Sequence, residues 1–213
     1  LCQRPRCWYY RLAEFDCRKK GGPTCYAQDG ENRFHAIFDS DLFCCCIHAS
    51  ATAVALLAYG AKLNTVSPRG RRTIVLDDFF VRPTEDARRE NVLTPGEIIE
   101  TITIPAPPPG GRSVYKKLKE KESFDWPLVE ACVNLTVSEG TVREARVILG
   151  SVAPTPHRAT EAEAVLRGAP ARPETASKAA AAAVANAKPL AQNAYKVRLA
   201  RVTLERALRE AFA

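Results

Sequence analysis

Methionine is absent from all 213 residues, and long hydrophobic runs are absent as well. The missing methionine at position 1 indicates that the chain is incomplete at its N-terminus. No run of roughly 18 or more apolar residues occurs, so the sequence predicts no membrane span. The sequence has no basic segment followed by an apolar one, so it shows no pattern of a secretory signal.

Several common functional motifs are also missing. Neither GxGxxG nor GxxxxGK[ST] occurs, so no phosphate-binding loop is visible. No histidine lies near a serine or cysteine and an acid in a pattern typical of nucleophilic catalysis. The net charge is +7, but basic and acidic residues alternate without stacking aromatics, so a nucleic-acid partner is not expected. A solvated surface explains the charge, with an anionic ligand or an acidic partner subunit as the alternative.

The pattern of elements predicts an α+β fold in two parts. The segment PAPPPGG, residues 105–111, is a stiff linker between residues 1–105 and residues 111–213. Before it we expect a helix from near Ser50 to Gly60, a hairpin whose turn lies at residues 67–70, and a strand in TPGEIIETITIP.

After the linker, the pattern predicts a three-stranded antiparallel sheet packed with C-terminal helices. The last of these helices lies in QNAYKVRLARVTLERALREAFA. Its predicted apolar face is formed by Val197, Leu199, Val202, Leu204, Ala207, Leu208 and Ala211.

Six of the eight cysteines lie between Cys7 and His48, in a segment without helix or strand periodicity. Clustered thiols without a secretory signal favour a reducing compartment, so we expect a cytoplasmic protein whose thiols bind metal. The lack of any Cys-x2-Cys pair disfavours a zinc ribbon. Widely spaced single cysteines fit an iron–sulfur cluster, and zinc or no ligand role are the alternatives. His35 and His48 are interpreted as structural.

The ordered segments QRPRCWYYR, CRKKGGPTCYAQDGENRFHAIF, CCCIHAS, TPGEIIETITIP, SVYKKLKEKESFDWPLVEACV, ILGSVAPTPHRA and NAYKVRLARVTLERAL resemble one protein family. It is the FAD-binding subunit of the xanthine dehydrogenase and aldehyde oxidoreductase family of molybdenum hydroxylases. The resemblance implies that residues 1–105 are the second half of the FAD-binding domain. It also implies that residues 111–213 are a C-terminal domain like that of the carbon monoxide dehydrogenase flavoprotein.

This resemblance implies an electron-transfer function. A molybdopterin-binding large subunit would carry out the hydroxylation, and a small [2Fe–2S] subunit would deliver electrons to FAD, from which they pass to NAD or another acceptor. Members with such a cysteine-bearing segment carry an additional [4Fe–4S] cluster, for which the resemblance implies Cys7, Cys17, Cys25 and Cys44 as ligands. Cys45 and Cys46 are additional to the family pattern.

The resemblance also implies flavin contacts. Ile99 matches an apolar residue that packs near the isoalloxazine, and Lys116 matches a lysine close to the flavin. A cation there would stabilise the anionic reduced flavin. Ala51 stands where the family has an acid that helps to hold FAD. A metal-stapled subunit-interaction module that has lost flavin binding is therefore the alternative function.

Overall fold

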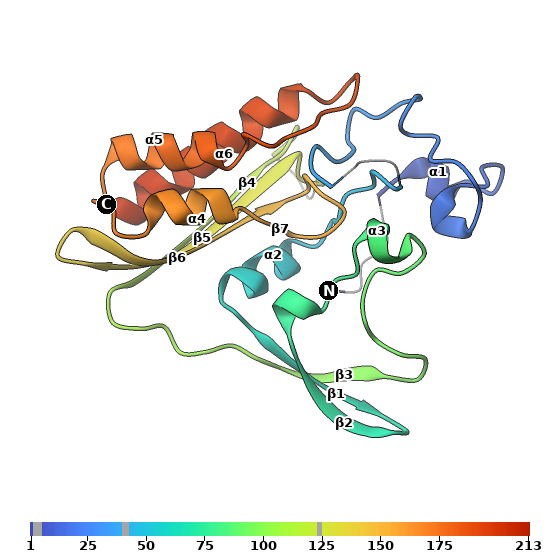
Figure 1. Cartoon of the computed structure of the whole chain (residues 1–213), viewed down its shortest axis with the longest axis horizontal. Helices are drawn as coiled ribbons and strands as arrows, with labels where there is room; N and C mark the ends of the chain where they lie inside the picture. The colour runs from blue at the N-terminus through green and yellow to red at the C-terminus, as the bar shows by residue number, and fades with distance from the viewer. Residues whose placement is uncertain (2–5, 40–42, 123–124) are drawn as a thin grey trace.

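The structure is a computed structural model that describes residues 1, 6–39, 43–122 and 125–213. Figure 1 shows two sheets, a group of C-terminal helices and an irregular N-terminal segment. In chain order the elements are α1 (Trp8–Arg11), the 3-10 turn η1 (Arg18–Lys20), α2 (Ala51–Ala58), β1 (Lys62–Ser67), β2 (Gly70–Val75), the 3-10 turn η2 (Leu76–Asp78), α3 (Pro83–Asp86), β3 (Ile98–Thr103), β4 (Gly111–Leu118), β5 (Val129–Ser138), β6 (Thr141–Gly150), β7 (His157–Arg158), α4 (Thr160–Leu166), α5 (Pro173–Ala182) and α6 (Tyr195–Phe212).

The larger sheet is antiparallel and has the strand order β4-β5-β6-β7. Its three long strands confirm the predicted three-stranded sheet, and β7 adds a fourth strand of two residues beside Ile148 and Leu149. The helices α4, α5 and α6 cover one face, and α2 packs on the other (Figure 1). Alternate residues of β5 divide between the two faces, because successive side chains of a strand point in opposite directions. Val133 belongs to the core under α6, whereas Cys132 belongs to the core under α2.

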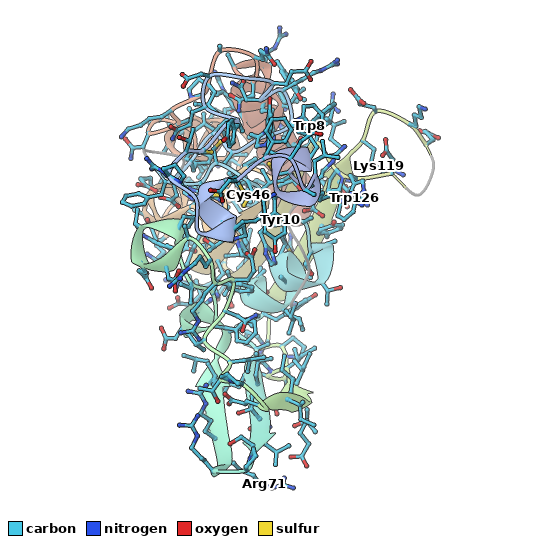
Figure 2. The ribbon with its side chains drawn as sticks, turned by 90° about the vertical axis from the view of Figure 1, so that its right-hand side faces the viewer. Trp8, Tyr10, Cys46, Arg71, Lys119 and Trp126 are labelled. Atoms are coloured by element: carbon cyan, nitrogen blue, oxygen red, sulfur yellow. The ribbon has the colours of Figure 1, made fainter. Side chains whose placement is uncertain are left out.

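The smaller sheet has the order β2-β1-β3 and projects away from the rest of the molecule (Figures 1 and 2). The predicted hairpin forms, with Ser67 paired to Gly70 at its turn. The predicted strand in TPGEIIETITIP also forms, as β3, but its isoleucines are not core residues. Ile98 and Ile104 are 63% and 52% exposed. The strand pattern therefore located β3 correctly, but it does not mark a buried face.

Both predicted parts of the chain contribute to one core. Leu63 of β1 and Ile74 of β2 pack in the same cluster as Cys132 and Ile148 of the larger sheet. The residues between β3 and β4, 104–110, form neither helix nor strand. The division into residues 1–105 and 111–213 as separate domains stays a prediction.

Helix α2 begins as predicted, because the Oγ of Ser50 accepts a hydrogen bond from the backbone N–H of Ala53 at 3.2 Å. The predicted face of α6 is only partly correct. Its buried positions are Lys196, Ala200, Thr203, Leu204, Ala207, Leu208 and Ala211. Val197, Leu199 and Val202 are only half-buried. The face of α6 that contacts the sheet is therefore rotated about the helix axis relative to the predicted apolar face.

The N-terminal segment is irregular, as its lack of periodicity predicted. Within residues 6–39 and 43–50, the regular elements are α1 and η1, each a single turn. A small cluster of Ala27, Ala36, Cys45 and Ile47 is the segment's own buried core. No described helix combines the length and the hydropathy that crossing a membrane would require.

Candidate functional site

The cysteine segment closes around a small cavity, here called the thiol cavity. Among its walls are Tyr9, Tyr10, Lys19 and Tyr26, together with the side chains of Cys7, Cys17, Cys25, Cys44 and Cys46. Figure 2 shows Tyr10 and Cys46 close together in this region. All four predicted metal ligands therefore face one space, although up to 37 positions separate them along the chain.

A tight turn brings Cys17 and Cys25 to the thiol cavity. The carbonyl of Cys17 accepts hydrogen bonds from the N–H groups of Lys20 (2.8 Å) and Gly22 (3.1 Å). Gly21 has a φ of 99°, a left-handed conformation that glycine adopts without strain. A side chain at Gly22 would collide with the backbone of Asp16. The turn at Gly21 and Gly22 is therefore what brings the two cysteines together.

The structure distinguishes the three consecutive cysteines. Cys44 and Cys46 line the thiol cavity, whereas Cys45 points into the small core beside Ala27 and Ala36. The sulfur atoms of Cys25 and Cys45 are 3.6 Å apart. Hydrogen bonding from Cys45 lowers the pKa of Cys25 to about 6, and hydrogen bonding from Cys46 lowers the pKa of Cys44. The same bonds raise the pKa values of Cys45 and Cys46. Cys25 and Cys44 are thus the thiolate-forming members of the two pairs.

Backbone N–H groups also face the sulfur atoms that are predicted to be ligands. Those of Ala27 and Gln28 donate to Cys25. Two further N–H groups, from Tyr9 and Tyr10, donate to Cys7, although burial outweighs them and raises the pKa of Cys7 to about 11. Hydrogen bonds to the sulfurs are one of the means by which proteins adjust an iron–sulfur cluster.

Lys19 adds a buried positive charge to the wall of the thiol cavity. Its side chain is 4% exposed, and its Nζ lies 2.6 Å from Glu90 Oε1 and 3.2 Å from the carbonyl of Ala87. Burial alone would lower the pKa of Lys19, but its interactions with Cys46, Glu90 and Cys44 outweigh burial and raise it. Lys19 therefore stays protonated and offsets negative charge on the thiolates.

The donor set fits a cluster better than a single ion. Among the described residues, no three His, Cys, Asp or Glu side chains are placed to hold one metal ion. A tetrahedral zinc site needs four donors within about 2.3 Å of the metal. A [4Fe–4S] cluster takes four thiolates from a wrapped loop, and its irons and sulfides lie between them. Cys7, Cys17, Cys25 and Cys44 are residues of this type around one cavity.

The structure does not bring the two predicted flavin contacts together. Ile99 of β3 is half-buried against the core on the α2 side of the larger sheet. Lys116 of β4 is ion-paired with Glu210 of α6, on the opposite side. Ala51 is the first residue of α2. The roles of Ile99 and Lys116 stay predictions.

Both histidines of the cysteine segment are buried. Burial lowers the pKa values of His35 and His48 to about 4, so both rings are neutral at pH 7. The His48 ring lies edge-on to the Phe80 ring, at 5.0 Å between centroids. Among the described residues, neither nitrogen of His35 has a hydrogen-bond partner, and the buried Nε2 of His48 has none either. The structural interpretation of the two histidines stays a prediction.

Two residues of α6 and the loop before it hold the cysteine segment in place, and the sequence did not reveal them. Lys196 is 1% exposed, and its Nζ donates to the carbonyls of His35 (3.1 Å) and Ser151 (2.6 Å). The Nδ2 of Asn193 donates to the carbonyls of His35 (3.2 Å) and Ala36 (3.0 Å). The one available signal was a lysine at an inner position of an amphipathic helix.

Comparison with known proteins agrees with this architecture. Residues 44–107 match the family described as the FAD binding domain in molybdopterin dehydrogenase. Residues 113–211 match the CO dehydrogenase flavoprotein C-terminal domain. The aldehyde oxidoreductase FAD-binding subunit PaoB of Escherichia coli is 36% identical over 99% of this chain and 64% of its own length. The chain belongs to the FAD-binding medium subunits of the molybdenum hydroxylase family.

Other members of this medium-subunit family show the same relationship. The carbon monoxide dehydrogenase medium chain of Afipia carboxidovorans is 34% identical over 71% of this chain and 52% of its own length. The solved carbon monoxide dehydrogenase of Hydrogenophaga pseudoflava has a TM-score of 0.69 at 33% identity, covering 77% of this chain and 56% of that one. The chain thus spans about half to two thirds of the length of these relatives. Cys7, Cys17 and Cys25 precede both family matches, whereas Cys44 begins the first of them.

Proposed function

We propose that this medium subunit transfers electrons through FAD and through a [4Fe–4S] cluster held by Cys7, Cys17, Cys25 and Cys44. The observation that carries the proposal is the convergence of these four thiols on one cavity. The family to which the chain belongs supports the flavin.

When bound, the cluster would supply one-electron transfer and the flavin would couple it to two-electron chemistry. The chain's own residues prepare the cluster site. Cys45 and Cys46 donate hydrogen bonds that favour the thiolate forms of Cys25 and Cys44. Lys19 holds a positive charge beside them. Cys17 and Cys44 are buried, which excludes bulk water from their sulfur atoms.

The relatives' names support a place in a larger assembly, since they describe a FAD-binding subunit and a medium chain. The proposed partners are a molybdopterin-binding large subunit and a small [2Fe–2S] subunit. Electrons would arrive from the small subunit and leave to NAD or another acceptor. Co-purification of the natural subunit with these two partners is expected, and isolation as a stable lone chain would contradict this assignment.

Iron analysis tests the cluster. The purified natural subunit is expected to contain about four iron atoms and four labile sulfides per chain. Cys17→Ser and Cys25→Ser should each remove most of this iron. Cys132→Ser is the matched control, because Cys132 is a buried thiol in β5 that does not line the thiol cavity. Unchanged iron in Cys17→Ser, or zinc in place of iron, would refute the ligand assignment.

Visible absorption tests the flavin separately. One FAD per natural subunit is expected, and Ala51→Asp should slow FAD loss on gel filtration, because it restores the acid found in the family. The alternative function, a metal-stapled subunit-interaction module, is favoured by Ala51 itself. Iron at full occupancy without bound FAD, in both the natural protein and Ala51→Asp, would establish this alternative.

A further inference from the structure

A second cavity shares one wall residue, Cys7, with the thiol cavity. Its volume is about 540 Å³, within the range of small-molecule sites. We call it the tryptophan cavity, because Trp8 and Trp126, the chain's two tryptophans, both line it. Figure 2 shows both on the same flank of the molecule, beside α1. Cys7 lines both cavities, so an occupant here would contact the proposed cluster segment.

The walls of the tryptophan cavity are aromatic. Trp8 and Trp126 are 36% and 38% exposed, which is unusual for such large apolar side chains. Phe34 forms a third aromatic wall. Flat apolar surfaces of this kind bind planar rings by stacking.

A cation lies among these rings. The guanidinium carbon of Arg6 is 4.7 Å from the centroid of the Phe34 ring and 5.8 Å from that of Trp126. Its Nη1 is buried and has no hydrogen-bond partner among the described residues. The carboxylates of Asp125 and Glu120 interact electrostatically with Arg6, but neither accepts a hydrogen bond from this Nη1. A guanidinium with a free donor in an apolar cavity is well suited to a planar carboxylate.

His35 supplies a second polar group to the same cavity. It is 6% exposed, and both its ring nitrogens lack hydrogen-bond partners among the described residues. An unpaired buried polar group destabilises the protein, and a ligand that bonds to it removes this cost. The Trp8 ring stands edge-on to the imidazole, at 6.4 Å between centroids.

We propose that the tryptophan cavity is a binding site for a planar aromatic carboxylate. Its ring stacks on Trp8 and Trp126, its carboxylate binds Arg6, and a ring substituent or the second carboxylate oxygen bonds His35. This site differs from the thiol cavity in every lining residue except Cys7, and it does not depend on a bound cluster.

Calorimetric titration of the flavin-loaded natural subunit with benzoate tests the proposal. Saturable binding is expected, with at least tenfold weaker binding of benzamide, which lacks the charge, and of cyclohexanecarboxylate, which lacks the flat ring. Arg6→Gln should weaken benzoate binding at least tenfold. Arg6→Lys keeps the charge but not the planar fork. Its affinity for benzoate should therefore lie between those of the natural protein and Arg6→Gln.

Arg33→Gln is the matched control, because Arg33 also lies over the Phe34 ring, at 5.4 Å, yet it does not line the cavity. It should bind benzoate like the natural protein. Equal affinities in Arg6→Gln and Arg33→Gln would overturn the proposal, as would the absence of saturable binding. Binding by the FAD-free protein alone would also overturn it, because the cavity would then belong to the flavin. Iron content is measured separately, so failure here leaves the cluster proposal untouched.

Discussion

Glu163 is a buried carboxylate at the junction of three elements. Its side chain is 1% exposed, and it accepts hydrogen bonds from Arg158 Nε at 2.9 Å, Arg167 Nη2 at 2.8 Å and the backbone N–H of Val147 at 3.1 Å. It thereby joins β6, β7 and α4. A buried carboxylate is tolerated when its lone pairs are satisfied in this way.

Replacing Glu163 by glutamine should lower the free energy of unfolding by about 2–3 kcal/mol, because an amide directs N–H groups at two guanidinium ions. Urea denaturation measures the change. Glu139→Gln is the control, since Glu139 is 87% exposed and pairs with Arg143 at 3.5 Å. It should change stability by less than about 0.5 kcal/mol. Equal losses in both variants would contradict this account of Glu163.

His35 makes stability depend on pH. Burial lowers its folded pKa from 6.5 to about 4, so between these values the unfolded chain binds a proton that the folded chain does not. Stability is therefore expected to fall as pH falls from about 6.5 to about 4, by up to about 3 kcal/mol for this residue. His35→Phe should lose less stability than the natural chain between pH 7.5 and pH 4.5, measured by urea denaturation. Identical losses would show that His35 is not neutral in the folded state.

At the scale of elements, α2 lies against β6 at Gly150. A β-carbon there would lie 2.6 Å from Cγ2 of Val54 and would also meet the carboxylate of Glu130. Glu130 is fully buried and accepts hydrogen bonds from Tyr115 and Ser151. The close packing of helix and sheet thus requires a glycine at this position.

Gly150→Ala should lower the free energy of unfolding by about 2–3 kcal/mol through overpacking. A double-mutant cycle with Val54→Ala identifies the contact. The cost of Gly150→Ala should be at least about 1 kcal/mol smaller in the Val54→Ala background, because the shorter side chain leaves room. Additive effects would mean that α2 does not press on β6 here.

The elements that the sequence predicted well have local signals. Ser50 caps the N-terminus of α2, Gly60 follows its C-terminal end, and the turn at residues 67–70 fixes the β1–β2 hairpin. Burial is not local. Ile98 and Ile102 of β3 follow a strand pattern yet remain exposed, and the buried stripe of α6 includes Lys196. Which residues are covered depends on elements far along the chain.

The sequence likewise predicted one part of the candidate site and not the rest. Cysteine spacing and family resemblance predicted Cys7, Cys17 and Cys25, which the glycine turn and α1 bring to one cavity. The roles within the triplet of residues 44–46 could not be predicted, because extended neighbours point in alternating directions and packing decides which faces inward. The tryptophan cavity could not be predicted either. Its walls come from four separate places in the chain: residues 6–12, residues 34–35, Ile47 and Trp126.

At the scale of the whole molecule, the start of the chain is held by its end. The backbone N–H of Asn32 donates to Gln192 Oε1 at 3.1 Å, and the N–H of Gln192 returns a bond to Asn32 Oδ1 at 3.0 Å. Asn193 and Lys196 extend this contact to the carbonyls of His35 and Ala36. An irregular segment with little core of its own depends on such long-range bonds for its shape.

Asn193→Asp should therefore loosen the cysteine segment from a distance. Asn193 is fully buried, and the change puts a carboxylate against the two carbonyl oxygens that its amide now serves. We expect a loss of about 3 kcal/mol in unfolding free energy, faster hydrogen exchange at Ala36 and Ile37, and lower iron content, although Asn193 is no ligand. Asn91→Asp is the matched control, because the Oδ1 of Asn91 accepts from the N–H of Leu93 at 3.1 Å, a bond that a carboxylate oxygen keeps. If exchange at Ala36 stays as slow in Asn193→Asp as in Asn91→Asp, the segment keeps its shape without the C-terminal contact.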